Sequence, residues 1–493
     1  MAQIAWLPWS AESFARARAE RRPVLLSIVA SWSQACREMD DTSYSDSAVA
    51  SIVHECFVPI RVDADYRPDI SERYSLGGWP TTAFLTCEGA LVGGGTFVSR
   101  DRMVSVLRKV ADAFESRAEE IAANAEADAG KPLAHDGSDS SGHEGESSES
   151  ALVEATFASF DEECGGFGIA PKFPLPAPIR LALHLHRDDG DSRAAHIASL
   201  SLDAIGWGPL HDEADGGFFR CADARNWEHP HREKLLDVNA ALIDLYVEAA
   251  TILDSQRYAD RAQDALTYVQ NWLGDQVDGG WAGSQRAAPV GSEDRAASGA
   301  RSAAVDRTLF ASWNGAMTSA ALRTAHAFHD DALGAFAITS LERLLATCYR
   351  PGQGVAHCVD GGSRIAGLLE DQFAVAGACL DAHDATGNIV YEMMAEELAR
   401  HAMRTMWNER AGAFFDRPVP GAGEAIGLMR RRLTPFGANC DAAIVLRRLA
   451  ASSGDSEFTS VADTTLASMS GCAMSQGPYA AHYVLALRAA RVR

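Results

Sequence analysis

Hydrophobic positions along this chain change their spacing at about residue 150. Up to residue 121, continuous apolar runs alternate with amphipathic stretches, which is typical of buried strands connected by helices. The runs follow a βαβαββα order, and a proline opens the third strand. We therefore predict an α/β domain over residues 1–121, with strands at 24–30, 57–63, 81–86 and 91–97, and helices at 10–21, after Ser33, at 46–55 and at 100–121.

From residue 151 to 493 the periodicity is helical throughout, with twelve amphipathic runs and no core strand. Connections after the odd-numbered runs are mostly long, whereas those after the even-numbered runs are short. This alternation gathers the long loops on one face of an array of helical hairpins. It predicts an all-α (α/α)6 barrel like that of six-hairpin glycosidases and sugar epimerases, with the even-numbered helices inside; an open helical solenoid is the alternative. The runs lie near 150–160, 178–189, 192–206, 234–253, 256–275, 312–329, 331–349, 369–386, 391–407, 437–452, 457–470 and 479–491.

Residues 122–150 separate these two regions. They are rich in Ala, Gly, Ser, Asp and Glu and contain almost no large apolar side chains. A segment of this composition cannot bury enough apolar surface to fold, so we expect a flexible linker there.

The turn after the first strand, Trp32 to Cys36, and the proline of the third strand resemble features of a thioredoxin fold. In that fold the matching proline is cis, which is our expectation for Pro80. Thioredoxins have W-C-x-x-C at this turn, but Ser33 replaces the first, attacking thiol here. We interpret Ser33 as a helix N-cap and Cys36 as a buried, inert thiol, so the motif is degenerate. We therefore do not expect a dithiol oxidoreductase.

Candidate chemistry is densest between Trp227 and Asn239, where imidazole, carboxylate, ammonium and amide groups lead into one helix. Five other segments stand before or at the start of the remaining even-numbered helices, so all six would line one mouth of the barrel. Helix N-termini at that mouth suit anionic or hydroxyl-rich ligands, and aromatic rings there could stack on a sugar. A polar cap with a solvated charge cluster explains any one of these residues equally well. The five segments are Ala170–Pro174, Ser312–Gly315, Glu370–Gln372, Thr434–Asn439 and Tyr479–His482.

The charge balance limits the partners. Lys and Arg total 44 against 67 Asp and Glu, a net charge of −23. Without a basic tract, this argues against nucleic-acid or anionic-membrane partners. Ten scattered cysteines without C-x-x-C or zinc spacing indicate free thiols, no metal site and a cytoplasmic location, and no cofactor motif occurs. Only four lysines are present, so nearly all basic residues are arginine. Either mutational bias in the genome or adaptation to high salt would explain this preference.

Several motifs together resemble the YyaL / spermatogenesis-associated protein 20 family. The resemblance implies a thioredoxin-like domain joined to a six-hairpin glycosidase-like barrel over essentially the whole chain, with no established reaction. Ser33 breaks the family's usual cysteine pair. Asp237-Val238-Asn239 stands where the family has Tyr-Asp-Asn, and Gln285-Arg286-Ala287 where it has Gln-Asp-Ala, so two expected carboxylates are absent. The motifs are Arg67–Ile70, Gly77–Pro80, Gly165–Gly168, Ala170–Pro174, Trp227 with Pro230-His231 and Glu233-Lys234, and Ser312–Gly315.

Fold and residue types lead us to expect binding of, or action on, a carbohydrate or similar polar small molecule. If the chain is an enzyme of glycosidase or epimerase type, His231 and Glu233 form an acid–base pair and Asp371 is the opposing carboxylate, all at one cavity. The alternative is a non-catalytic ligand- or partner-binding regulatory protein, in which the first domain docks a protein partner. A single-thiol redox or chaperone role through Cys36 is a third hypothesis. Expected ligand contacts are Lys172, Phe173, Trp227, Lys234, Asn239, Trp313, Asn314 and Glu370.

Overall fold

The computed structural model describes residues 3–129, 148–287, 305–360, 362–421 and 423–490. The chain forms two compact units. The first unit comprises residues 1–134 and 419–432, and the helical unit comprises residues 135–418 and 433–493. None of the helices in these described ranges is long and apolar enough to span a bilayer.

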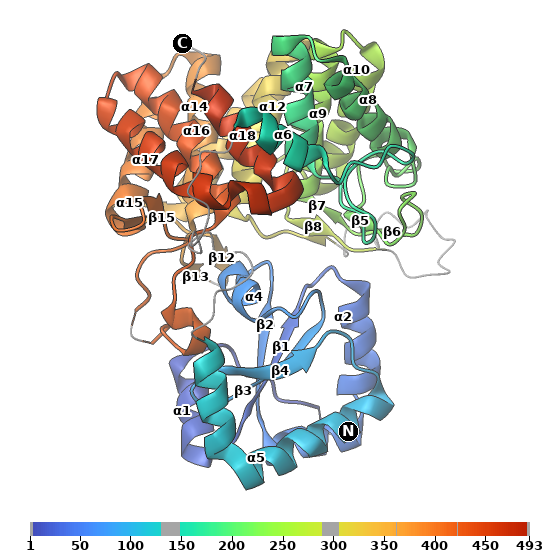
Figure 1. The fold of residues 1–493 in the computed structure, drawn as a ribbon, viewed down its shortest axis with the longest axis vertical. Helices are drawn as coiled ribbons and strands as arrows, with labels where there is room; N and C mark the ends of the chain where they lie inside the picture. The colour runs from blue at the N-terminus through green and yellow to red at the C-terminus, as the bar shows by residue number, and fades with distance from the viewer. Residues whose placement is uncertain (1–2, 130–147, 288–304, 361, 422, 491–493) are drawn as a thin grey trace. The chain divides into compact units, whose positions relative to one another are not determined.

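A four-stranded mixed sheet in the order β2-β1-β3-β4 is the centre of the first unit (Figure 1). β1 pairs in parallel with β2 and antiparallel with β3, and β3 pairs antiparallel with β4. Successive side chains of a strand point to opposite faces, so Leu25 and Phe84 join one apolar layer while Leu26 and Ala83 join the other. The strands are β1 (Val24–Val29), β2 (Val58–Asp63), β3 (Thr81–Leu85) and β4 (Leu91–Gly95).

Helices cover both faces of this sheet. Side chains of α3 and α5 pack in the layer that contains Leu25, and side chains of α1 and α4 pack in the layer that contains Leu26. The thioredoxin-like α/β fold predicted from the sequence is confirmed. The helices are α1 (Ala11–Glu20), α2 (Gln34–Met39), α3 (Ser47–Cys56), α4 (Pro68–Tyr74) and α5 (Arg100–Ala129), and a π-helical turn, η1 (Asp40–Tyr44), follows α2.

The last helix of the first unit is longer than predicted. We expected it to end near Ile121 and a linker to begin at residue 122, but α5 continues past a kink at Arg117 to Ala129. Residues 122–129 include five alanines, and alanine has the highest helix propensity. The rest of the expected linker, residues 130–147, lies outside the described residues.

Residues 419–432 also depart from the predicted domain boundaries. We placed them in the barrel domain, but they pack in the first unit. Ile426, Leu428 and Met429 are buried in the apolar layer around Tyr74. A loop between two helices of the helical unit thus supplies part of the core of the first unit, which spacing along the chain could not indicate.

All twelve helices predicted for the second region are present in the helical unit. The predicted (α/α)6 architecture is confirmed. The helices are α6 (Glu149–Phe157), α7 (Pro176–Asp189), α8 (Ser192–Trp207), α9 (Leu236–Ile252), α10 (Gln256–Tyr268), α12 (Ala311–Phe328), α13 (Asp331–Cys348), α14 (Leu369–Thr386), α15 (Ile389–Thr405), α16 (Phe436–Ser453), α17 (Ser456–Ala473) and α18 (Ala480–Ala489), with short helical turns η2 (Val269–Leu273), η3 (Gly427–Arg430, in the first unit) and η4 (Met474–Tyr479).

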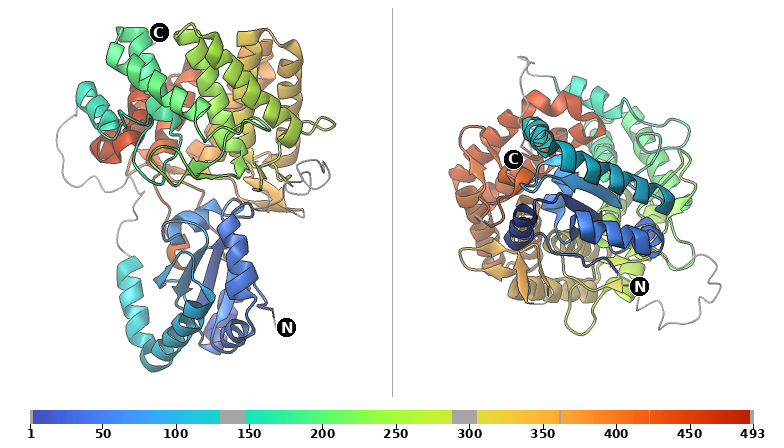
Figure 2. Two further views of the ribbon diagram at one scale, coloured as in Figure 1. Left: turned by 90° about the vertical axis from the view of Figure 1, so that its right-hand side faces the viewer. Right: turned by 90° about the horizontal axis from the view of Figure 1, so that it is seen from below.

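The inner helices close into a ring, which rules out an open solenoid. α7 packs on α9, and the contacts continue in order through α12, α14, α16 and α18, which packs back on α7. The outer helices α8, α10, α13, α15, α17 and α6 pack on these six in turn. Viewed from one end, the helices form a ring (Figure 2).

The long loops of the helical unit gather at one end of the ring, as the alternating loop lengths predict. Their short strands lie together at that end in Figure 1. Within the described residues these strands form five small sheets, of which β7-β8-β9 joins two different loops. The strands are β5 (Cys221–Ala222), β6 (Pro230–His231), β7 (Lys234–Leu235), β8 (Ser284–Gln285), β9 (Val305–Asp306), β10 (Tyr349–Arg350), β11 (Gly354–Val355), β12 (Cys358–Asp360), β13 (Ser363–Ile365), β14 (Trp407–Asn408) and β15 (Ala413–Phe414).

Candidate functional site

Glu370 is the second residue of α14 and the most strongly perturbed accessible carboxyl group at the inner-helix starts. Its side chain is exposed to solvent, yet dense protein surrounds it. This enclosure raises the pKa of Glu370, and the nearby carboxylates of Asp371 and Asp441 raise it further, to about 7. The group is therefore about half protonated at neutral pH, as a general acid requires.

Asp441 and His482 form a hydrogen-bonded pair beside Glu370. Oδ1 of Asp441, on α16, lies 3.0 Å from Nδ1 of His482, on α18. Burial alone would lower the pKa of His482, but Asp441 raises it above its usual value. Both residues also act electrostatically on Glu370, so three consecutive inner helices bring these side chains near one another. Asp441 is a candidate functional residue that we did not predict from the sequence. It could have been found as the carboxylate two residues after the Thr434–Asn439 segment.

Asp237 is a second carboxyl group with a raised pKa. It is the second residue of α9 and is half-buried. Burial raises its pKa to about 6, although Arg220 and the Val238 N–H act in the opposite direction. The family comparison indicated that a carboxylate was missing at position 238, but the preceding position supplies one.

Asp371, predicted as the opposing catalytic carboxylate, is almost completely buried. Its oxygens accept hydrogen bonds from the backbone N–H groups of Ser312 (3.0 Å) and Leu368 (2.8 Å), and they lie 3.0 Å from Nδ1 of His357. Burial alone would raise the pKa of Asp371, but His357 and these donors hold it below its usual range. The carboxylate therefore caps α14 and ties it to α12, so it positions Glu370 rather than facing solvent.

Lys172 is fully buried and forms part of a structural ion cluster. Its Nζ donates to Oδ2 of Asp161 (2.8 Å) and to the Arg225 backbone oxygen (2.9 Å), and it lies 5.0 Å from the ring centroid of Trp227. Burial alone would raise the pKa of Asp161, but the bonds from Arg225 and Lys172 hold it well below its usual range. Trp227 is buried as well and donates from Nε1 to the Cys164 backbone oxygen. The expected ligand contacts at Lys172 and Trp227 are thus occupied by the protein itself.

His231 and Glu233 lie close together but differ in access. His231 is 37% exposed in its side chain, and its Nε2 lies 2.7 Å from Asp223 Oδ1. Its Nδ1 lies 3.7 Å from Oε1 of Glu233, which is buried and accepts from Arg220 Nε at 2.9 Å. Arg220 also lies 5.8 Å from the ring centroid of Phe173, which is 39% exposed. Of the predicted pair, only His231 is available to a ligand.

Lys234, close to His231 and Glu233 in the sequence, is buried. Its Nζ lies 2.8 Å from Asp212 Oδ2 and donates to the Gly216 backbone oxygen at 2.6 Å, with the Tyr268 ring centroid 4.0 Å away. Burial lowers its pKa, against the attraction of Asp212. Lys234 thus fixes a Gly-Gly-aromatic turn and is closed to a ligand.

The fourth residue of four inner helices is an amide that holds a loop turn. Asn314 accepts from Trp281 N at 2.9 Å and donates to the Trp281 and Phe310 backbone oxygens at 3.0 and 3.1 Å. Asn239 holds Phe218 in the same way, and Gln372 and Asn439 hold the equivalent residues of their loops. Both N–H donors of Asn239 and Asn314 are used, so these predicted ligand contacts are structural parts of the hairpin repeat.

A chain of ion pairs joins the inner helices further along their length. Arg180 on α7 lies 2.6 Å from Asp244 on α9, and Asp244 lies 2.9 Å from Arg323 on α12. Arg323 lies 3.1 Å from Asp381 on α14, which lies 2.7 Å from Arg448 on α16. These charges neutralise one another and tie consecutive inner helices together.

Two connected groups of predicted site residues emerge. Lys172 pairs through backbone with Ala222, and the adjacent Cys221 pairs with His231, so Lys172, Trp227, His231, Glu233 and Lys234 belong to one loop layer. Asp371 and Glu370 belong with Ser312, next to Trp313, whose ring lies 4.8 Å from that of Phe310. The convergence of His231 and Asp371 on one cavity stays a prediction.

The degenerate redox motif of the first unit has the predicted local structure. Ser33 is the N-cap of α2, and its Oγ accepts from the Cys36 N–H at 3.3 Å. Cys36 is buried, which raises the pKa of its thiol. The Trp79–Pro80 peptide bond is cis. A raised thiol pKa works against nucleophilic chemistry at this site.

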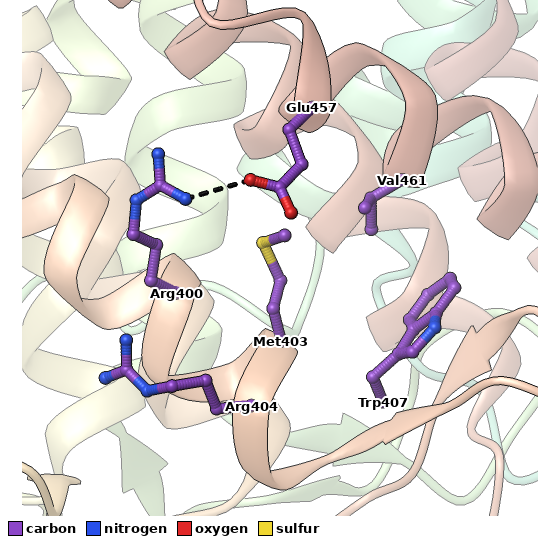
Figure 3. Close-up of a pocket in the computed structure, with 6 residues that line it drawn as sticks. All are labelled: Arg400, Met403, Arg404, Trp407, Glu457 and Val461. Atoms are coloured by element: carbon purple, nitrogen blue, oxygen red, sulfur yellow. Dashed lines mark hydrogen bonds and ion pairs between the residues drawn. The ribbon is translucent and has the colours of Figure 1, made fainter.

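A pocket on the outside of the helical unit opens between α15 and α17 (Figure 3). Arg400, Met403, Arg404, Trp407, Glu457 and Val461 line it. Arg400 is engaged by Glu396, Asp455 and Glu457 at 2.8, 2.6 and 3.0 Å. The pocket lies between outer helices, and its Arg400 is already paired with these carboxylates. Within the described ranges, no group of three or more His, Cys, Asp or Glu side chains could hold a metal ion.

Comparison with known proteins supports both parts of the architecture. Residues 1–131 match the model of the Thioredox_DsbH family, described as a protein of unknown function, DUF255. Spermatogenesis-associated protein 20 of Mus musculus is 30% identical over 293 residues, covering 55% of this chain and 37% of the relative. The Homo sapiens protein is 29% identical and covers the same shares. The alignment therefore spans little more than a third of the length of these curated relatives.

Solved structures match the helical unit in fold. Cellobiose 2-epimerase from Bacillus thermoamylovorans has a TM-score of 0.52 at 10% identity, covering 64% of this chain and 85% of that one. A glycoside hydrolase family 76 mannosidase from Bacteroides thetaiotaomicron has a TM-score of 0.52 at 10% identity, covering 70% and 98%. The resemblance to the YyaL / spermatogenesis-associated protein 20 family that the motifs indicated is thus confirmed in sequence and in fold.

Proposed function

We propose that the helical unit binds a carbohydrate at the N-terminal ends of its inner helices and cleaves a glycosidic bond there by acid catalysis. The carrying observation is Glu370, an accessible carboxyl group with a pKa of about 7 beside the Asp441–His482 pair. The (α/α)6 fold shared with a mannosidase and a sugar epimerase is consistent with a sugar ligand but does not by itself assign one.

In the proposed reaction, neutral Glu370 gives its proton to the glycosidic oxygen as the bond to the anomeric carbon breaks. Water adds to that carbon and passes a proton to Asp441, which is hydrogen-bonded to His482. Trp313, half-buried at the start of α12, supplies an aromatic surface for the sugar. His231 is the other accessible polar contact from our original set, whereas Asp371 and Glu233 act as positioning residues.

A non-catalytic ligand-binding role is the second candidate. It is favoured by the number of rim groups, including Lys172, Lys234 and Asn239, that are consumed by bonds within the protein. Fewer free groups then remain for catalysis, although Glu370 and His482 would still bind sugar hydroxyls.

The test uses the full-length protein with a panel of neutral oligosaccharides and sugar phosphates. Thermal shift identifies binding, and mass spectrometry follows hydrolysis with time. Glu370→Gln should lower kcat by about 100-fold or more, while Asp384→Asn, an exposed change at the opposite end of α14, should not. Wild-type turnover should fall as the pH rises above about 7, because Glu370 then loses its proton. Turnover unaffected by Glu370→Gln would refute the mechanism, and binding without turnover would select the second candidate.

A further inference from the structure

The loop between β15 and α16 contributes residues 419–421 and 423–432 to the first unit. We call these residues the strap. At its centre, η3 (Gly427–Arg430) packs on α4 of the first unit. Ile426, Leu428 and Met429 are 8%, 4% and 0% exposed, as low as the core of an ordinary domain. The strap therefore packs as part of the apolar core of the first unit, against α4.

Tyr74 recognises the backbone of the strap. Its hydroxyl is fully buried, donates to the Gly89 backbone oxygen at 2.7 Å and accepts from the Leu428 N–H at 2.8 Å. Gly427 has a φ of +53°, and a Cβ there would collide with the Gly89 backbone oxygen and the Tyr74 hydroxyl. The surface thus selects a glycine between two apolar residues.

Charged residues extend the contact toward the C-terminal end of the strap. The Arg73 guanidinium is almost fully buried and donates from Nη2 and Nε to the Arg431 backbone oxygen at 2.8 and 3.2 Å. Arg430 lies 3.6 Å from Glu126 of α5. Because Arg73 binds a backbone oxygen, the direction of the strap is specified as well as its position.

The base of the strap holds the start of α14 within the helical unit. The Asp416 N–H donates to the Leu433 backbone oxygen, and the Leu433 N–H donates to Asp416 Oδ1, both at 2.8 Å. The Asp416 backbone oxygen accepts from the Leu369 N–H at 2.8 Å. Leu369 immediately precedes Glu370. The residues that flank the strap, Asp416 and Leu433, are therefore hydrogen-bonded to each other and, through Asp416, to the first turn of α14.

We propose that the first unit is a clamp for the strap, and that release of the strap loosens the first turn of α14. The thioredoxin-like unit then serves as an anchor that sets the position of Glu370 through the chain at Asp416 and Leu433. The binding of the strap by the first unit does not depend on any reaction. The effect of the strap on catalysis through Glu370 rests on the proposed function. A partner that displaces the strap would act on the carbohydrate site without touching it.

Hydrogen–deuterium exchange of the ligand-free, full-length protein tests the clamp. Leu428→Asp places a charge in the apolar layer, and Tyr74→Phe removes only the hydroxyl, so the second variant keeps the test valid if the first unit of the first variant unfolds. Met393→Asp, at an exposed residue of α15 (62% exposed), is the matched control. Peptides covering 419–432, 366–373 and 311–318 report the strap, the start of α14 and the start of α12.

We expect both clamp variants to accelerate exchange about tenfold or more at 419–432 and at 366–373, with 311–318 and the control variant unchanged. Strap peptides that stay protected in both variants would overturn the clamp. Strap peptides that open while 366–373 stays protected would overturn the link to α14. Because no sugar is present, either failure is distinguishable from failure of the glycosidase proposal, which Glu370→Gln tests separately.

Discussion

The charge on Asp237 should destabilise the helical unit at neutral pH. Burial raises the pKa of Asp237 from about 3.8 to about 6. A carboxyl group whose pKa is raised by folding contributes stability that is fully present below the unfolded pKa and is lost as the pH rises through the folded pKa. The window therefore runs from about pH 4 to about pH 6. Its full height approaches about 3 kcal/mol, since a tenfold change in proton affinity is about 1.4 kcal/mol, and water reaching the half-buried side chain reduces it.

Asp237→Asn keeps the size and the acceptor oxygen of the side chain but removes the charge. Urea unfolding of the full-length protein, followed through the transition of the helical unit, should give equal stabilities for variant and wild type near pH 4. Near pH 8 the variant should be more stable by up to about 3 kcal/mol. Asp278→Asn, at an exposed loop residue, controls for a general effect of lowering the net negative charge. A pH-independent difference, or a less stable variant near pH 8, would refute the account of Asp237 as an enclosed and uncompensated carboxylate.

Two further changes test the structural assignments. Asn314→Ala should destabilise the helical unit by about 3 kcal/mol in the same urea assay, because it leaves a buried N–H and two carbonyl groups without their hydrogen-bond partner. The control is Asn388→Ala, an exposed change that removes only a cap of α15 and should cost about 1 kcal/mol. Equal losses of stability would contradict the role of Asn314 in holding its loop turn. The wild-type protein should not reduce insulin disulfides, since Ser33 replaces the attacking thiol and burial raises the pKa of Cys36; reduction by the wild type would contradict this, and Ser33→Cys should form a disulfide with Cys36 only if the Cα atoms can approach to about 5.5 Å.

Elements with regular periodicity were predictable because periodicity reports burial directly. An outer helix such as α15 buries one stripe, so its apolar spacing appears in the sequence, whereas an inner helix such as α14 is buried on most sides and appears as a longer apolar segment. The closed ring followed from alternating loop lengths. The strap was not predictable, because Ile426, Leu428 and Met429 are a short apolar cluster in a loop, and nothing local shows that their partner is Tyr74, some 350 positions earlier (428 − 74 = 354).

Polar residues of the rim could be located but not assigned roles. Lys172 and Asn239 stand out in the sequence because they are polar residues within otherwise largely apolar segments. Their purpose proved to be internal, an ion pair with Asp161 and a clasp on Phe218. Burial with a satisfied partner and exposure toward a ligand select the same residue types. The regular signal was present, since an amide is the fourth residue of four inner helices, but its meaning required the loops in place.

Glu370 and Asp371 show why the proposed catalytic assignment needed the three-dimensional structure. Adjacent residues of a helix point about 100° apart, so only one of them can face the barrel mouth. An inner helix is surrounded by apolar neighbours, and its sequence pattern does not reveal which face is turned inward. In this chain Asp371 turns toward Ser312 and His357 and is consumed by them, which leaves Glu370 enclosed but open to water. That rotation is set by how α14 packs between α12 and α16, so helix packing, and not residue type, decides which carboxyl group is available for the proposed reaction.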